Sequence, residues 1–457
     1  MKTPRVRERI VAEGVWTAAS ALHTGGDATL EHNVDMALLR SASGFLVPGS
    51  SVAGAARSYL ARRTQSDPEF RTGQESAALQ SLFGGRLQRK GNQAVYASLL
   101  SISDARQVGP GVALVRDCVR IDDVTGIAAD EAKFNLEVLP AGSSFALRLE
   151  LVVYEDTPEE TLGALRMVLE GFASGEIRLG ARTRKGLGVG RVALWQVRRL
   201  MMNDAVAVRA WLARELSAVP VVSVESLGPA SESQREWLEI EAAFHLKTSL
   251  LIRAGSEDPR LPDMTHLTEA GQALLSGSSL LGALRHRVGK IAETLGIPRE
   301  TETRMFGPIH GERGKGKGLY AGRVWVREAA VEQAALAVQS RVALDRFTGG
   351  ALETALFDEA PCWPKRGGGV NLRLQIGLEL RADEWDQAAG ALLLAAFKDL
   401  WLADLPLGGE VGVGRGVLEG LTATIRRTGW PEVKLEGSHL TGWTAQWATW
   451  TALEVRA

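Results

Sequence analysis

GSSVAGAAR at residues 49–57 and GSSLLGALR at residues 277–285 are two versions of one nine-residue segment, separated by 228 positions. Other parts of the chain match at the same separation: Asp35-Met36 with Asp263-Met264, Leu179-Gly180 with Leu407-Gly408, and Trp16 with Phe244. Anchors that recur at one fixed separation indicate a tandem duplication, which must be recognised before any local pattern is interpreted.

Length and duplication together predict two modules. In a chain of 457 residues we expect a first module over 1–200, a helical connection and linker over 201–236, and a second module over 237–457. Each module is long enough to bury its own core.

Composition excludes several classes of protein. Cys118 and Cys362 are too few for a disulfide framework or a four-ligand zinc site. No apolar run is long enough to cross a membrane and the N-terminus lacks the apolar part of a signal peptide, so we expect a cytoplasmic protein. The net charge of −1 means that any nucleic-acid binding must depend on local basic clusters.

Hydrophobic periodicity predicts the same order of elements in both modules. The first is expected to contain strand 9–22, a helix from Pro48-Gly49 to about Arg62 capped by Ser50 or Ser51, strands 94–103 and 145–154, helix 157–172 and strand 191–197. The second is expected to contain strand 239–252, helix 277–295, strands 323–327 and 370–380, and helix 383–402 capped by Asp383. This βαββαβ order predicts an α+β protein of two ferredoxin-like (RRM-like) modules, and a fold by itself assigns no function.

Each module also carries a predicted hairpin tip, at 119–128 and at 342–350. Thr125-Gly126 and Thr348-Gly349 supply the turn residues.

A glycine-rich loop follows the last helix of each module. Gly186, Gly188 and Gly190 alternate with apolar residues, and Gly180, Arg182, Arg184 and Lys185 precede them. Backbone amides without side chains can approach phosphate oxygens, and cations add charge-assisted bonds. The second loop keeps Gly412 and Gly414 but has one arginine, Arg415. The alternative is a tight turn with solvated basic residues, and a Rossmann site is excluded because the loop lies late in the module.

The start of each duplicated helix is a second candidate anion site. Gly49-Ser50-Ser51 and Gly277-Ser278-Ser279 offer N–H and hydroxyl donors, while Arg57 and Arg285 lie further along. Ordinary helix capping is the alternative interpretation.

The repeated aspartates Asp35 and Asp263 are the third candidates. A loop carboxylate can hold a divalent metal or move a proton, and a turn aspartate bonded to its own backbone is the alternative. His32 and His266, three residues to either side of these acids, are interpreted as surface histidines.

Taken in order, these elements resemble the RAMP superfamily of CRISPR-associated proteins. The pattern is an aspartate, then PGSS-x-x-G-x-x-R, then D-x-x-TG-x-A, then G-x-x-x-R-x-G-x-G. In the first module it covers Asp35, Pro48 to Arg57, Asp122 to Ala128 and Gly180 to Gly188. In the second it covers Asp263, Ser276 to Arg285, Asp345 to Ala351 and Gly408 to Gly416. The chain is most similar to the backbone subunit of type III effector complexes, with two fused modules as in type III-D systems.

The resemblance implies a function. Each module would grip guide RNA, with phosphates held at the glycine-rich loop and helix start, and the hairpins carrying Asp122, Thr125, Asp345 and Thr348 would act as thumbs. Asp35 and Asp263 match the aspartate that cuts target RNA in a step dependent on Mg²⁺ or Mn²⁺, with attack by a ribose 2′-OH. The implied partners are guide RNA, complementary target RNA, a large polymerase-like subunit, other RAMP subunits and a small helical subunit, with no membrane.

The sequence departs from the family pattern at three points. Ser276 replaces Pro48 of the first copy, the second loop has lost most of its basic residues, and methionine follows both aspartates. We therefore favour Asp35 as the cleaving residue and keep Asp263 as a second site. Three alternatives remain: a non-cleaving RNA-binding scaffold, a nuclease that processes guide RNA, and a regulatory module for a small ligand.

Overall fold

The computed structural model describes residues 5–26, 34–64, 76–89, 92–122, 128–230, 233, 235–255, 262–308, 321–380 and 386–437. It forms two compact units. Unit 1 comprises residues 1–115, 135–183 and 187–235, and unit 2 comprises residues 116–134, 184–186 and 236–457.

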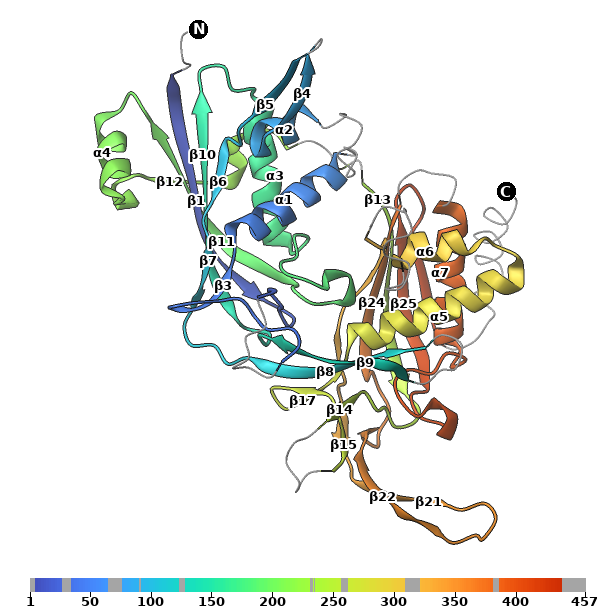
Figure 1. Cartoon of the computed structure of the whole chain (residues 1–457). Coiled ribbons are helices and arrows are strands. Elements are labelled where there is room, and N and C mark those ends of the chain that lie inside the picture. Colours follow the sequence, from blue (N-terminus) through green and yellow to red (C-terminus); the bar gives the residue numbers. More distant parts are fainter. Residues whose placement is uncertain are drawn as a thin grey trace. The chain divides into compact units, whose positions relative to one another are not determined.

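Unit 1 is built on an antiparallel sheet with β1 (Val6–Ala18) at its centre (Figure 1). β1 pairs on one side with β10 (Ser144–Tyr154) and on the other with β11 (Gly190–Met201). Shorter strands extend this sheet: β2 (Arg40–Ser41), β3 (Gly44–Val47), β6 (Leu100–Ile102), β7 (Ala105–Val108) and β12 (Val221–Val222). Two further strand pairs lie outside this sheet: β4 (Gly85–Arg89) with β5 (Asn92–Tyr96) in unit 1, and β8 (Leu114–Ile121) with β9 (Ala128–Val138), of which residues 116–134 are grouped with unit 2.

The alternation in β10 explains how this sheet is covered. Phe145, Leu147 and Leu149 are buried on one face. On the other face Glu150 accepts a 2.7 Å bond from Arg9 of the neighbouring strand. A strand with one apolar and one charged face needs a cover on only one side.

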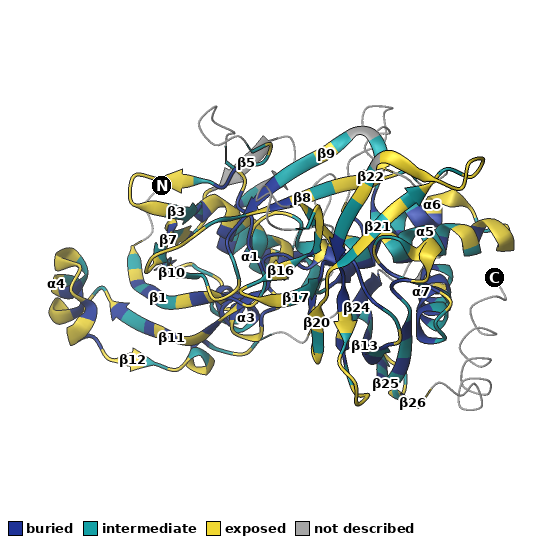
Figure 2. Cartoon of the chain, turned by 90° about the horizontal axis from the view of Figure 1, so that it is seen from below, coloured by how far each residue is buried: buried dark blue, intermediate teal, exposed yellow. Residues whose placement is uncertain are grey.

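Helices cover the apolar face of unit 1. α1 (Gly49–Arg63), α2 (Ala77–Phe83) and α3 (Glu160–Ser174) pack against it (Figure 1). α4 (Ala205–Ala213) packs on Val11 and Leu200, which point to the opposite face from Ile10. Most of α4 is exposed (Figure 2).

Unit 2 contains a second antiparallel sheet with a similar strand order. β13 (Glu236–Leu246) lies between β24 (Leu372–Leu380) and β25 (Leu418–Arg427), with β18 (Val324–Val326) and β26 (Val433–Glu436) at the edges. Along β13 and β24 most residues are buried or half-buried (Figure 2). The smaller strands are β14 (Arg253–Gly255), β15 (Met264–His266), β16 (Thr268–Glu269), β17 (Gln272–Leu275), β19 (Ala329–Ala330), β20 (Ala334–Leu336), β21 (Gln339–Leu344), β22 (Ala351–Ala360) and β23 (Cys362–Pro364).

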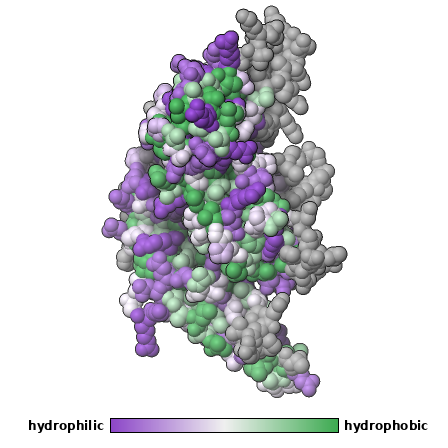
Figure 3. All heavy atoms as spheres, turned by 90° about the vertical axis from the view of Figure 1, so that its left-hand side faces the viewer, coloured by the Kyte–Doolittle hydropathy of each residue, from purple (hydrophilic) through white to green (hydrophobic). Residues whose placement is uncertain are grey.

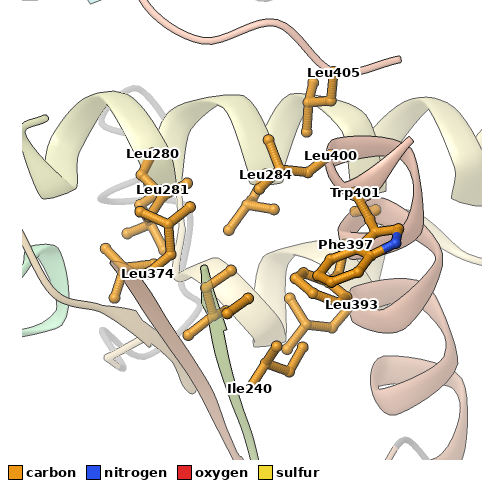
Figure 4. Packing of buried hydrophobic residues seen from close by; sticks show 14 of the residues in the cluster. Ile240, Leu280, Leu281, Leu284, Leu374, Leu393, Phe397, Leu400, Trp401 and Leu405 are labelled. Atoms are coloured by element: carbon orange, nitrogen blue, oxygen red, sulfur yellow. The ribbon is translucent and has the colours of Figure 1, made fainter. Parts of the chain in front are cut away.

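The helices of unit 2 are α5 (Gly277–Leu295), α6 (Arg299–Phe306) and α7 (Asp386–Trp401). Their apolar side chains meet those of the sheet in one core, in which Phe397 and Trp401 lie beside the leucines of α5 (Figure 4). Phe244 of β13 makes edge contacts with both aromatic rings, at centroid distances of 6.3 and 5.8 Å.

Two glycines on closing strands make room for tryptophan rings. A Cβ at Gly190 would lie 2.3 Å from the ring of Trp16, and a Cβ at Gly420 would lie 2.1 Å from Trp401. Glycine is therefore required at these strand positions because an indole crosses the backbone there.

The described residues confirm a mixed α/β protein with mainly antiparallel sheets, and helix 277–295 is found with the predicted bounds. The predicted serine cap of α1 is wrong, because Pro48 is the N-cap and makes no side-chain bond. Strand 94–103 is interrupted between β5 and β6. The predicted cap Asp383 and the turn residue Thr125 lie outside the described residues.

Surface and burial add two observations. On the face drawn in Figure 3, hydrophobic and hydrophilic residues are interspersed. Within the described residues, no helix combines the length and apolar character needed to span a membrane.

Candidate functional site

Asp35 is fixed to strand β9 by two reciprocal hydrogen bonds. Its Oδ2 accepts a 2.8 Å bond from the backbone amide of Asn135, and its own amide donates a 2.6 Å bond to Oδ1 of Asn135. Met36 then pairs with Leu136 in parallel. The exposed carboxylate is thus held by a residue 100 positions away, which is not the local turn bond of the alternative interpretation.

Asp263 has the same anchoring in the second copy. Its Oδ2 accepts a 2.9 Å bond from the amide of Asp358, and Met264 pairs in parallel with Glu359. Asp358 therefore occupies the place of Asn135, so a second carboxylate stands beside the bond that holds Asp263.

Arg182 lies next to the Asp35 segment. Its Nη2 is 3.4 Å from Sδ of Met36. Its φ of 59° is in the left-handed region, which is sparsely populated by residues other than glycine. The loop therefore places one cation beside the residue that follows Asp35.

The glycines of the first loop have packing roles. A Cβ at Gly180 would lie 2.3 Å from the carbonyl oxygen of His23, and a Cβ at Gly188 would lie 1.7 Å from that of Leu179. The amide of Gly188 donates a 2.7 Å bond to Ala21. The backbone amide of Gly188 is therefore hydrogen-bonded within the protein.

Arg184, Lys185 and Gly186 are grouped with unit 2, whereas Arg182 is grouped with unit 1. Arg184 donates a 2.7 Å bond to Glu379. A Cβ at Gly186 would lie 2.6 Å from the amide nitrogen of Glu328. Of the predicted phosphate cradle of 180–188, Gly180, Arg182 and Gly188 lie in unit 1 with Asp35.

Each duplicated helix start already has a carboxylate of the chain beside it. The amide of Gly49 donates a 2.8 Å bond to Asp104, and the backbone of Gly277 bonds to Glu328. Ser50, Ser51 and Ser278 are exposed, and Ser279 is half-buried. At α5 the cap is Ser276, which accepts a bond from the Ser279 amide.

The two arginines predicted to bind RNA on these helices are Arg57 of α1 and Arg285 of α5. Arg57 is half-buried on α1. Arg285 of α5 donates a 2.8 Å bond to Glu302.

At the tip of β21–β22, Asp345 organises the turn. Its Oδ1 accepts bonds from the amides of Phe347 and Thr348 and from the Thr348 hydroxyl, at 2.9, 2.7 and 3.0 Å. These bonds, chiefly those from Thr348, hold the pKa of Asp345 below its ordinary value. Phe347 is 92% exposed. In the first copy, Asp122 is half-buried at the end of β8.

The second glycine loop is organised around a buried arginine. Arg415 is 2% exposed, and its guanidinium bonds to Glu410, Glu359 and Ser249 at 2.9, 3.0 and 3.2 Å. Gly412 lies within a 3₁₀ turn at Val411–Val413, and Gly414 is its C-cap. Arg415 is thus enclosed within unit 2 and held by carboxylates of the chain.

Several residues of these sites were not found from the sequence. Asn135, Glu359 and Glu410 carry no local motif, and the duplication alone does not single them out. His23 lies beneath the first loop with Nδ1 2.7 Å from the Glu137 carbonyl. Burial lowers its pKa, and the nearby charge of Arg182 adds to this effect.

His266 is buried, which corrects its interpretation as a surface residue. Its Nδ1 lies 3.0 Å from the Leu250 carbonyl oxygen, and burial lowers its pKa to about 4. It belongs to the interior of unit 2 and does not extend the Asp263 site. His32 lies outside the described residues.

A metal at Asp35 would find few protein ligands. Within the described part of the chain, no group of three or more His, Cys, Asp or Glu side chains is placed to hold one. Mg²⁺ commonly binds through one or two carboxylates together with waters and substrate phosphates. Asp35 suits that mode, in which the nucleic acid supplies the other ligands.

Comparison with known families identifies the chain at the level of its superfamily. The model of the RAMP superfamily matches residues 17–191 and 243–419. The chain belongs to the RAMP superfamily. Both RAMP matches contain one anchored aspartate and one glycine-rich loop, and they end 228 residues apart (419 − 191), as the duplication requires. No curated protein matches the sequence.

Because the chain belongs to the RAMP superfamily, it is associated with RNA binding in type III CRISPR complexes. The same superfamily includes RNA endonucleases.

Proposed function

We propose that the chain is a guide-RNA-binding backbone subunit of a type III CRISPR effector complex, similar to type III-D, and that it cuts complementary target RNA at Asp35. Its two modules are ferredoxin-like, and β8–β9 and β21–β22 are their thumb hairpins. Asp263 is the second candidate position. Mg²⁺ or Mn²⁺, guide RNA and the other effector subunits complete the active assembly.

The paired anchoring of the aspartates carries this proposal. In each copy Oδ2 accepts an amide bond from the strand that leaves the hairpin, at 2.8 Å for Asp35 and 2.9 Å for Asp263. One exposed carboxylate is thereby fixed at an equivalent place in both modules. A repeated, rigidly held acid suits a role at regularly spaced positions along one strand of RNA.

Asp35 is assigned a role in proton transfer or in cation binding during cleavage of the target RNA. A ribose 2′-OH attacks the neighbouring phosphate to form a 2′,3′-cyclic phosphate, and the P–O bond to the 5′-oxygen of the next nucleotide breaks, that oxygen leaving as a hydroxyl with a proton from solvent. The Asp35 carboxylate accepts the 2′-OH proton or helps to hold the cation. A divalent cation, when bound, neutralises charge that develops on the phosphate oxygens. Arg182 adds a positive charge beside Met36, the residue that follows Asp35.

The experiment uses the complex purified with its own RNA. Adding target RNA complementary to the bound guide, with and without Mg²⁺, is expected to give a ladder of products only when the cation is present. A complex that retains target but gives no ladder is a scaffold, and one that cuts precursor guide without target is a processing nuclease. Either result contradicts the proposal.

Salt dependence separates RNA binding from binding of a small ligand. Contacts with phosphates release counterions, so the logarithm of the RNA association constant should fall linearly with the logarithm of salt concentration. Binding that is independent of salt would favour a regulatory module.

A further inference from the structure

The loop position occupied by Arg182 in the first copy carries the opposite charge in the second. The separation of 228 residues places Glu410 at the equivalent position. The two residues have φ angles of 59° and 58°. The same left-handed backbone therefore presents a cation in one loop and a carboxylate in the other.

Three arginines converge on the Glu410 carboxylate. Oε2 lies 2.9 Å from Nε of Arg415 and 3.0 Å from Nη1 of Arg341, while Oε1 lies 3.3 Å from Nη2 of Arg253. Guanidinium groups around two oxygens are the arrangement that proteins also use to bind phosphate. Here the anion is supplied by the chain.

Glu359 completes the cluster from β22. It is 1% exposed and lies 3.0 Å from Arg415 and 3.4 Å from Arg341. Burial raises its pKa, and the neighbouring Glu410 carboxylate raises it further. For Glu410, burial opposes ionisation, but its bond with Glu359 and the arginine charges outweigh burial and lower its pKa. Glu410 is thus the carboxylate that stays ionised among the arginines.

In the first module, leucines occupy the positions that correspond to Arg415 and Glu359. Leu187 stands 228 residues before Arg415, and Leu136 pairs with Met36 as Glu359 pairs with Met264. Both leucines are buried. Burying ion pairs where the sister module has leucines gains little stability, so stability alone is a weak reason for the cluster.

We propose that the second glycine loop is an anion site occupied by its own side chain, in which the Glu410 carboxylate takes the place of a phosphate. The site takes inorganic phosphate or a phosphodiester once that carboxylate is removed. In the native chain the loop of the first copy binds RNA phosphate and the loop of the second does not. The RNA part of this inference rests on the proposed function.

The variants remove the carboxylate while keeping the fold. Glu410→Gly suits the left-handed backbone, which glycine adopts without steric cost, and Glu410→Gln keeps the size of the side chain. Glu432→Gln is the control for charge alone, because Glu432 pairs with Arg426 at 2.8 Å on β25, outside the loop. Melting temperatures of the full chain in buffer without phosphate show whether each variant folds.

The first measurement uses inorganic phosphate and needs no RNA. Phosphate is expected to raise the melting temperature of Glu410→Gly, since a ligand bound to the folded state stabilises it. It should raise that of the wild type and Glu432→Gln much less. An equal rise in all three proteins, or none in Glu410→Gly and Glu410→Gln, overturns the inference.

The second measurement uses single-stranded RNA at several salt concentrations. Glu410→Gly is expected to bind about tenfold more tightly than Glu432→Gln at low salt. Its plot of log affinity against log salt should be steeper by about one. Phosphate binding without any RNA binding in any variant would contradict the proposed function and leave the anion site standing. Unchanged RNA affinity in Glu410→Gly beside strong wild-type binding would contradict the inference alone.

Discussion

Asp35 and Asn135 exchange two hydrogen bonds, of 2.8 and 2.6 Å, across 100 residues of sequence. Only the second of these uses the asparagine side chain. The first comes from the backbone, as does the bond from Asp358 to Asp263. Asn135 is therefore a positioning residue that orients the loop, while the strand itself holds the carboxylate.

Changing Asn135 to alanine should slow target cleavage and leave RNA affinity nearly unaltered. The Asp35 amide loses its acceptor, so the carboxylate becomes less well oriented. Losses of this kind lower activity on the order of ten- to a hundredfold. Single-turnover rates at increasing Mg²⁺ check this, and a purely structural role would lower the melting temperature without altering the Mg²⁺ dependence. Asn135→Asp, which copies the second module, keeps the acceptor and should retain more activity.

Removing Arg415 should destabilise unit 2 unless Glu359 is removed with it. Arg415→Leu leaves a buried carboxylate without its closest partner, at a cost of about 3 kcal/mol. The double variant Glu359→Leu/Arg415→Leu installs the residues that the first copy has, Leu136 and Leu187, and should recover most of that loss. Urea unfolding of the four proteins of this cycle measures the coupling. Additive losses would show that the two side chains act independently.

Acid should destabilise the chain through His266. Its pKa is about 4 in the fold and about 6.5 when unfolded, so below pH 6.5 the unfolded state binds the proton first. Stability is complete above pH 6.5 and falls as pH drops towards 4, by about 2 kcal/mol between pH 7.5 and 5.0. His266→Asn should weaken this dependence in urea titrations followed by tryptophan fluorescence. His286 is half-buried on α5, and His286→Asn is the control. Identical pH profiles for the two variants would contradict the assignment.

Two phenylalanines of unit 2 should respond oppositely to truncation. Phe397 is fully buried beside Phe244 and Trp401, so Phe397→Ala should cost about 3–5 kcal/mol. Phe347 is 92% exposed at the hairpin tip, so Phe347→Ala should leave the melting temperature within a degree or two. A large loss at Phe347 would show that the tip packs within the chain.

Much of the architecture was predictable because it depends on periodic patterns. The alternation of Phe145, Leu147 and Leu149 placed β10, and the repeat at Gly277 placed the start of α5. The predicted serine cap of α1 failed because Pro48, directly after β3, occupies the N-cap position, and Asp104 accepts the bond from the Gly49 amide. A cap supplied from 55 residues away leaves no local signal.

The candidate site was predictable only in part, for the same reason. The duplication singled out Asp35 and Asp263 but gave no sign of Asn135 or Asp358, whose bonds form only when distant strands meet. The loss of basic residues from the second loop was visible in the sequence. That Arg415 is buried and Glu410 surrounded by arginines depends on β15 and β22 lying side by side, which no local spacing encodes.

The most direct test of the central claim is to map cuts in a guide-matched target RNA by complexes carrying Asp35→Asn or Asp263→Asn. The account predicts that Asp35→Asn assembles normally and binds target, yet slows one Mg²⁺-dependent cut by about 10²–10⁴. If every cut persists at the wild-type rate in the complex carrying both changes, Asp35 is not the cleaving residue and the chain is a scaffold.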